Sequence, residues 1–219
     1  MSKKQLRNKG LLAFLLVLSL GVFAFGLYGL WQFRPETTHK APDPNIVATS
    51  SDIDPNEEDI SPEAEYNVPA GHPRRIILPS IGAEGFVQQV GVDDKGNIAV
   101  PTNINLAGWF VDNPKPGDKG VSLIDGHVQG WHHPGIFKDL KNLEAGDTFE
   151  VEYGDYSKRR FEVVGVKSYS VSDVAEHMLA QAEGIENQLN LITCGGRFDP
   201  QADRYEDRVL VVSKRIDES

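Results

Sequence analysis

Cys194 is the only cysteine in this chain of 219 residues, and it follows a short apolar run, residues 189–193, directly before two glycines. A cysteine thiolate is a strong nucleophile that forms covalent acyl intermediates. A lone cysteine is otherwise often a small buried hydrophobic residue. The two interpretations differ in whether the fold places a base and a cation beside the thiol.

His127 is the best candidate for that base among the six histidines. It ends the apolar run of residues 121–126, and catalytic residues are common where a strand gives way to a loop. His39 lies in an acidic Pro-rich segment, His72 at the edge of the globular part, and His177 on a predicted surface helix. A loop histidine with only a structural or solvated role is the competing interpretation.

Arg208 is the candidate cation, because it begins the apolar run of residues 209–212, a predicted strand. If this strand pairs with the one that ends at Cys194, the guanidinium reaches a carbonyl under attack by the sulfur and stabilises the oxyanion. Arg197 and Arg204 are the neighbouring alternatives. A surface ion pair is the ordinary fate of an arginine in such a position.

The elements that position these residues are mostly short strands. Apolar or alternating runs are separated by turn sequences, for example at residues 94–97 and 116–118, which is typical of a β protein. Helices are limited to residues 174–181 and a single turn within 134–143. Many short strands without crossover helices favour a closed barrel or a sandwich. The predicted strands are residues 75–78, 85–90, 120–125, 148–153, 159–169, 189–193 and 207–214.

The N-terminal part predicts a membrane anchor. Residues 1–10 carry basic residues and no acidic one, and residues 11–33 carry no charge. An apolar run of about 20 residues crosses the roughly 30 Å hydrocarbon core of a bilayer. The positive-inside rule then predicts a cytoplasmic tail at 1–10, a single transmembrane signal anchor at 11–33, and an extracellular catalytic domain at the cell membrane.

Residues 34–69 are predicted to be a disordered tether, because they are acidic and Pro-rich and lack the apolar residues of a core. Residues 70–219 are predicted to form one extracytoplasmic domain of ordinary size. The formal net charge of −10 argues against nucleic acid as a partner.

His127, Cys194 and Arg208, in this order behind an N-terminal anchor, resemble the sortase family of cysteine transpeptidases. Residues 191–194 read LITC, which is similar to the sortase active-site strand, and residues 125–127 read DGH, which is similar to its histidine segment. Residues 74–79 resemble the first strand of the domain. Residues 193–199 are similar to the class F sortases in particular.

This resemblance implies a fold and a reaction. The fold is all-β, a closed eight-stranded β-barrel with short helices, preceded by one transmembrane helix. In the reaction, Cys194 attacks the Thr–Gly bond of an LPXTG-like sorting signal, and an amine such as a cell-wall precursor resolves the thioacyl enzyme. His127 would be the general acid that protonates the leaving amine, and Arg208 would orient the substrate and stabilise the tetrahedral intermediate. No cofactor is expected, because thioester chemistry with these groups needs none.

The resemblance also bears on substrate binding and on the choice of arginine. Thr193 is expected to shape the substrate groove, and Trp109 to line a peptide groove or pack in the core. Class F sequences often place an arginine directly after the tyrosine of the last motif and an asparagine two positions later, where this chain has Glu206 and Arg208. Arg208 fits the position used by other classes at the head of the last strand, so it is preferred.

Three alternatives stay open. A zinc site would use His127, His132 and His133 with Asp125 or Cys194, although adjacent histidines on an extended chain do not easily bind one ion. Asp125 otherwise faces away from His127 or tunes it. An L,D-transpeptidase is a second candidate, but its Ser-x-Gly-Cys signature is absent. The third is a non-catalytic surface domain of sortase-like fold with an inert thiol.

Overall fold

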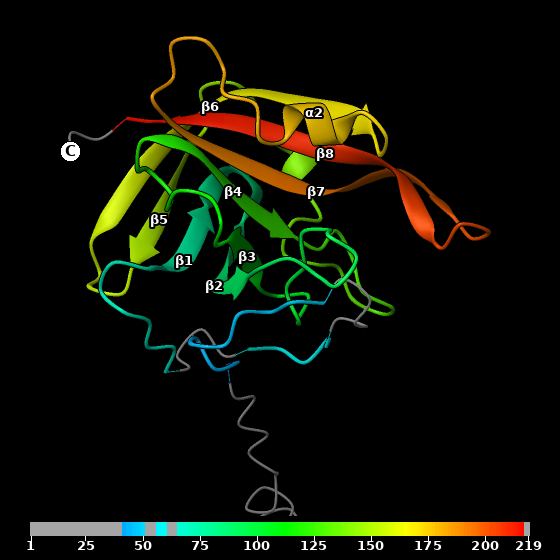
Figure 1. Ribbon diagram of the computed structural model, residues 1–219, viewed down its shortest axis with the longest axis horizontal. Helices are drawn as coiled ribbons and strands as arrows, with labels where there is room; N and C mark the ends of the chain where they lie inside the picture. The colour runs from blue at the N-terminus through cyan, green and yellow to red at the C-terminus, as the bar shows by residue number, and fades with distance from the viewer. Residues whose placement is uncertain (1–40, 51–55, 61–64, 217–219) are drawn as a thin grey trace, which may run out of the picture. The chain divides into compact units, whose positions relative to one another are not determined.

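Eight β-strands form a closed barrel in the order β1-β2-β3-β4-β7-β8-β6-β5 (Figure 1). The structure is a computed structural model, and it describes residues 41–50, 56–60 and 65–216. The prediction of an all-β closed barrel of eight strands is confirmed. The strands are β1 (Pro73–Leu78), β2 (Ala83–Val90), β3 (Ala107–Phe110), β4 (Gly120–Gly126), β5 (Thr148–Tyr153), β6 (Lys158–Ser170), β7 (Asn187–Asp199) and β8 (Arg204–Arg215).

The helices in the described part of the chain are short. They are the 3-10 helices η1 (Pro79–Ile81) and η2 (Leu140–Asn142), and the α-helix α2 (Val174–His177). The predicted single turn within residues 134–143 corresponds to η2. The predicted helix at residues 174–181 is only one turn long, because the backbone after His177 is held by side chains of β7 instead. Asn190 Nδ2 donates to the Met178 carbonyl, and Gln188 Nε2 donates to that of Ala180.

The pairing of β7 with its two neighbours determines the geometry of the site. β4 and β7 are parallel, with Asp125 opposite Ile192. β7 and β8 are antiparallel, with Ile192 opposite Leu210 and Cys194 opposite Arg208. Strand β7 therefore lies between the strand that leads to the candidate histidine and the strand that carries the candidate arginine.

The barrel interior is an apolar core to which the strands contribute alternate residues, as the pleat of a strand requires. In β7 these are Leu189 and Leu191, and in β8 they are Val209 and Val211. Phe149 and Phe161 stack inside the barrel with their ring centroids 5.3 Å apart. Burial of such side chains is the main source of stability, at about 25 cal/mol per Å² of apolar surface removed from water.

A second apolar cluster covers the outer face of β4, β7 and β8. Leu123, Ile192 and Leu210 belong to it, and Val174 and Met178 pack onto it from α2 and the residue after it. These strand residues alternate with the residues of the barrel core, so they point outward. The three central strands are therefore buried on both faces along part of their length.

Several strands differ from their predicted bounds. β3 was not predicted, because its four residues are all buried and show no alternation between apolar and polar positions. β7 does not end near Cys194 but continues to Asp199, and β8 begins at Arg204, four residues before Arg208. The two strands pass beyond the barrel as a hairpin, orange to red in Figure 1. An irregular register between Gly195 and Phe198 lets the pairing resume beyond the two glycines.

The described parts of residues 34–69 lie against the barrel, which differs from the expected disordered tether. Tyr66 is 1% exposed, packs with Phe86 and Leu106, and donates a hydrogen bond of 3.0 Å to the Val87 carbonyl. Ala48 forms a parallel bridge with Val90. A few apolar residues thus attach the segment to the barrel, although its overall composition is acidic.

The predicted transmembrane anchor at residues 11–33, and the basic tail before it, lie outside the described residues. Within residues 41–50, 56–60 and 65–216, no helix has the length and apolar character needed to cross a membrane.

Candidate active site

The strand register places the three candidate catalytic residues in one row on the outer face of the barrel. Cys194 and Arg208 are opposite each other on β7 and β8. Asp125 is opposite Ile192 on the parallel strands β4 and β7, so His127, two residues further along, comes level with Cys194. The thiol thus has a histidine on one side and an arginine on the other. The sequence prediction of these neighbours agrees with the register.

The row continues the outer apolar cluster. Ile192 and Leu210 belong to that cluster, and two residues further along β7 and two residues back along β8 are Cys194 and Arg208. Because side chains two residues apart share a face, the functional groups stand at the edge of an apolar surface. A polypeptide bound here meets apolar and reactive groups side by side.

The thiol of Cys194 is partly buried and is not in a disulfide. Burial raises the pKa of the Cys194 thiol above its ordinary value; the positive charge of Arg208 opposes this shift, and the negative charge of Asp125 adds to it. At neutral pH the group is therefore mostly the protonated thiol, and it needs a base in order to attack.

His127 is held by the loop between β2 and β3. Its Nε2 atom lies 2.8 Å from the carbonyl oxygen of Pro101. A carbonyl only accepts, so Nε2 carries the proton, and in the neutral imidazole Nδ1 is left with a lone pair. Burial lowers the pKa of His127, and the bond to Pro101 partly offsets this shift. The resting ring is neutral and able to take a proton.

The guanidinium of Arg208 is anchored by carbonyl groups of its own hairpin. Its Nη1 donates to the carbonyl of Asp207 at 2.9 Å and more weakly to that of Tyr205 at 3.4 Å. These acceptors are neutral, so the positive charge is not cancelled by a carboxylate at these contacts. This is the arrangement expected of a cation that stabilises an oxyanion.

The two other arginines considered from the sequence lie further along the hairpin. Arg197 is 82% exposed and makes an ion pair of 2.7 Å with Glu206. Arg204 is exposed and lies opposite Asp199 at the end of the pairing of β7 with β8. The register thus favours Arg208 over both.

Thr193 and Trp109 differ from their expected places in a substrate groove. Thr193 is 5% exposed, and its Oγ1 donates a hydrogen bond of 2.6 Å to the Gly126 carbonyl. Its side chain faces inward, where it ties β7 to β4 next to His127. Trp109 is 3% exposed, belongs to the barrel core, and donates through Nε1 to the Pro114 carbonyl. Trp109 therefore packs in the core, one of the two places expected for it, and Thr193 contributes a buried hydrogen bond.

Two neighbours of the site were not identified from the sequence. Pro101 lacks any reactive group, and only the fold shows that its carbonyl holds His127. Burial raises the pKa of Tyr205, and the charge of Cys194 adds to that shift, so this phenol lies close enough to sense the thiol. Tyr205 also makes an edge-to-face contact with the exposed ring of Phe198, with centroids 5.3 Å apart. An aromatic pair thus stands on the hairpin next to the reactive row.

The zinc alternative finds no support in the described residues. His132 and His133 are both exposed on the loop after His127, and the backbone amide of His132 donates to Glu57. No group of three or more His, Cys, Asp or Glu residues suited to a metal ion occurs in residues 41–50, 56–60 and 65–216.

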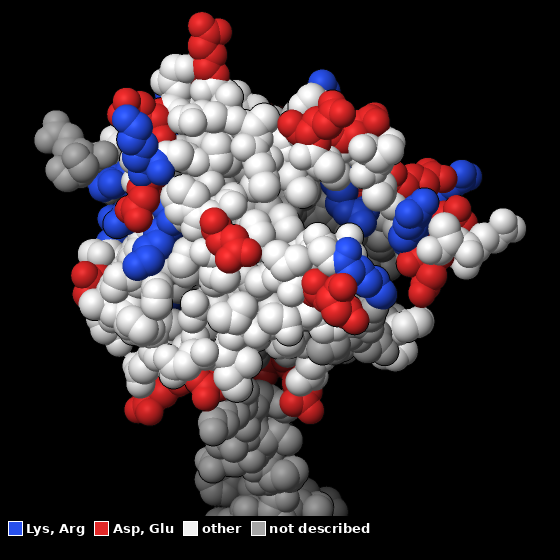
Figure 2. Space-filling model, viewed as in Figure 1, with Lys and Arg blue, Asp and Glu red and all other residues white. Residues whose placement is uncertain are grey.

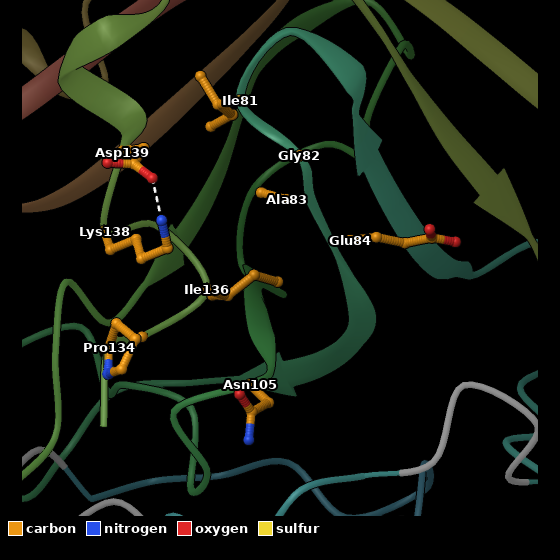
Figure 3. A pocket seen from close by; sticks show the side chains of 10 residues that line it. Ile81, Gly82, Ala83, Glu84, Asn105, Pro134, Ile136, Lys138 and Asp139 are labelled. Carbon is orange, nitrogen blue, oxygen red and sulfur yellow. Dashed lines mark hydrogen bonds and ion pairs between the residues drawn. The ribbon is translucent and has the colours of Figure 1, made fainter. Parts of the chain in front are cut away.

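A separate hollow of about 180 Å³ lies at the turn between β1 and β2 (Figure 3). Ile136 and Asn105 line it, and the ion pair of Lys138 with Asp139 stands at one side. Cys194, His127 and Arg208 do not contribute to its lining. On the face shown in Figure 2, basic side chains lie mainly beside acidic ones, and most of the surface is uncharged.

Comparison with known proteins gives the family. Residues 76–216 match the family model described as "Sortase domain". The lid mutant of sortase A from Corynebacterium diphtheriae is similar in fold, with a TM-score of 0.52 and 21% identity over 69% of this chain and 72% of that one. Sortase C1 from Streptococcus agalactiae, in complex with MTSET, has a TM-score of 0.51 and 20% identity over 70% and 73%. No curated protein matches the chain.

Proposed function

Because the chain belongs to the sortase family, we propose that it is a membrane-anchored cysteine transpeptidase that cleaves an LPXTG-like sorting signal and transfers the acyl part to an amine. The observation that carries the proposal is the row formed by His127, directly after β4, Cys194 on β7 and Arg208 on β8. Each member has a neighbour suited to its role, and the row borders an apolar surface on which a peptide can lie.

In the first step, the sulfur of Cys194 attacks the carbonyl carbon of the threonine of the sorting signal. The thiol proton passes to Nδ1 of His127, the nitrogen left free by the bond to Pro101. The negative charge that develops on the carbonyl oxygen is stabilised by Arg208. The imidazolium then gives its proton to the departing glycine nitrogen, the C–N bond breaks, and a thioester remains.

In the second step, an amine attacks the thioester carbonyl. His127 is neutral again after the first step, so it takes the proton that the amine loses. The C–S bond breaks and the proton returns to Cys194, which restores the resting thiol and imidazole. An exported protein would in this way be joined to a cell-surface amine such as a cell-wall precursor.

Anchoring belongs to the same proposal. Residues 11–33 form an uncharged apolar run behind a basic tail, which predicts a cytoplasmic N-terminus and an extracellular catalytic domain. Protease treatment of intact cells should degrade the domain and spare a short anchored fragment. A full-size chain in the soluble fraction would contradict the anchor. Residues 193–199 are the feature that favours class F within the family.

The proposal is tested by intact-mass spectrometry of the full-length chain with an LPXTG-type peptide, alone and with an added amine. We expect a mass gain equal to the acyl part of the peptide, which disappears when the amine is added. Cys194→Ala should abolish the adduct, and Arg197→Ala should retain it. A thiol that neither forms the adduct nor reacts with an alkylating agent would support a non-catalytic surface domain instead.

The L,D-transpeptidase alternative predicts a different acyl donor. A peptidoglycan stem peptide would then give the adduct on Cys194, and the LPXTG-type peptide would not. Both peptides offered in one reaction separate the two enzymes by the mass of the product.

A further inference from the structure

We infer that Asp125 is a positioning residue of this site, whose carboxyl group controls how readily the thiol of Cys194 ionises. The inference rests on the proposed role of Cys194 as the nucleophile and adds a fourth group to the row. It starts from one oxygen atom: Oδ1 of Asp125 is buried and has no hydrogen-bond partner among the described residues.

The register places this carboxyl beside the thiol. Leu123 of β4 belongs to the outer apolar cluster, so Asp125, two residues further along, points to the same outer side as Cys194. Asp125 is opposite Ile192, which is two residues before Cys194 on the same face of β7. The carboxyl and the thiol are therefore diagonal neighbours on adjacent strands, and Asp125 does not face away from His127.

The close approach of β3 makes room for the carboxyl. Gly108 of β3 is opposite Asp125, and a Cβ atom at Gly108 would overlap Oδ1. The same position would come within 2.9 Å of the Pro101 ring, whose residue also holds His127 through its carbonyl. A glycine is thus required where the carboxyl packs, and the carboxyl lies under the loop that fixes the histidine.

A buried carboxylate oxygen without a partner is costly when charged, so the burial of Oδ1 favours the neutral form of the group. Burial raises the pKa of Asp125 well above its ordinary value, an effect that its own backbone amide offsets only in part. The charged or titratable groups on this side are Cys194 from β7, with Arg208 beyond it on β8, and His127, which directly follows β4. Gly108 and Pro101, from the elements on its other side, carry no charge.

Ionisation of Asp125 therefore disfavours ionisation of the Cys194 thiol, because two negative charges close together repel each other. An ionised Asp125 raises the pKa of the thiol, while Arg208 lowers it. Removal of the carboxylate leaves Arg208 as the main charge beside the thiol. In Asp125→Asn the pKa of the thiol should therefore fall, so that the thiol ionises at lower pH than in the wild-type chain.

The test is the pH dependence of alkylation of the full-length chain by iodoacetamide, followed by intact mass. Cys194 is the only cysteine, so every adduct reports this thiol. We expect the midpoint of the rate profile to fall by about one pH unit in Asp125→Asn, which is about tenfold in thiolate fraction on the rising limb. No peptide is involved, so the result is independent of whether the sorting-signal proposal holds.

Asp207→Asn is the matched control. Asp207 adjoins Arg208 and is opposite Gly195, but it points to the other face of β8. Its substitution should leave the midpoint unchanged. A profile of Asp125→Asn that overlays the wild type, or an equal shift in Asp207→Asn, would overturn the inference.

A measurement on the wild-type chain covers the case in which Asp125→Asn does not fold. Infrared difference spectra over a pH titration should show a protonated carboxylic acid that persists near neutral pH, where an exposed Asp is ionised. Alkylation of Cys194 should sharpen or shift that band, since the thiol is its neighbour. Absence of a protonated acid near neutral pH would contradict the inference.

Discussion

The interior of the barrel and the outer face of β4, β7 and β8 are made by the same strands but have different roles. Inside, Leu191 and Val209 are buried among other apolar groups, and burial stabilises the fold. Outside, burial reaches His127 and Cys194 as well, where it holds both groups in their neutral forms. One physical effect, the loss of water, therefore stabilises the fold on one face and changes the pKa of titratable groups on the other.

The difference between the barrel interior and the outer face is tested most strongly by His127→Ala. The substitution leaves the barrel core intact but removes the imidazole that serves as the base in the proposed mechanism, so thioacyl formation should fall by about 10²–10⁴-fold. The rate of adduct formation with the LPXTG-type peptide measures this. The unfolding midpoint should stay close to that of the wild type, and a large drop in stability would mean that the ring has a structural role.

Phe161→Ala is the opposite test. Phe161 is fully buried against Phe149, so its loss should destabilise the domain by about 3–5 kcal/mol. Denaturant unfolding measures the change. At temperatures where the variant stays folded, the alkylation profile of Cys194 should match that of the wild type, because the cavity opens on the inner side of the barrel.

Arg208→Ala should lower the rate of thioacyl formation by about 10²–10³-fold if Arg208 stabilises the oxyanion. Arg197→Ala is the control, since Arg197 is exposed and pairs with Glu206 away from the row. Equal losses of rate in the two variants would show that the reaction depends on the general positive charge of the hairpin. A loss of rate in Arg197→Ala alone would assign oxyanion stabilisation to Arg197 instead.

Thr193→Val tests the buried hydrogen bond that joins β7 to β4 beside the candidate site. It removes a buried donor and leaves the Gly126 carbonyl without its side-chain partner, which should cost about 1–3 kcal/mol of stability. The shape of the side chain is preserved, so the adduct rate should change less than in Arg208→Ala. Unfolding and adduct rate measured on the same sample separate the two effects.

The smallest expected effect concerns pH. The pKa of His127 is lowered in the folded state by burial, so this neutral ring contributes stability above the unfolded pKa of about 6.5, and the contribution is lost as pH falls through the folded pKa. In His127→Gln this loss is absent. The difference in unfolding free energy between the two chains should therefore narrow or reverse as pH falls from about 7 towards 5. A constant difference would mean that His127 titrates normally.

Much of the fold follows from the sequence. Strands with alternating or apolar runs, such as β5 and β8, were predicted within a few residues of their bounds, since turns with Gly, Asp and Pro separate them. β3 could not be predicted in this way, because Ala-Gly-Trp-Phe has no alternation and is buried throughout. Its identity as a strand depends on the parallel pairing with β2, which is a tertiary contact.

The residues of the candidate site with intrinsic reactivity could be singled out from the sequence, and the register brings them onto neighbouring elements. Cys194, His127 and Arg208 were found through residue type, position near strand ends and resemblance to a family. Pro101 was not assigned a role and that of Asp125 was left open, because their contacts depend on which strands and loops become neighbours. For Trp109 the sequence could not decide between a groove and the core, since an aromatic residue near a site can belong to either face of a strand.

The pairing of β4 with β7 also has a consequence for folding order. The bond from Thr193 to Gly126 joins residues 67 positions apart in the chain. Contacts of such long range form late, because the entropy of closing the intervening loop must be overcome first. Before that event Cys194 has neither His127 nor Arg208 beside it and is an ordinary cysteine. The row of His127, Cys194 and Arg208 therefore comes together only when these distant strands have paired.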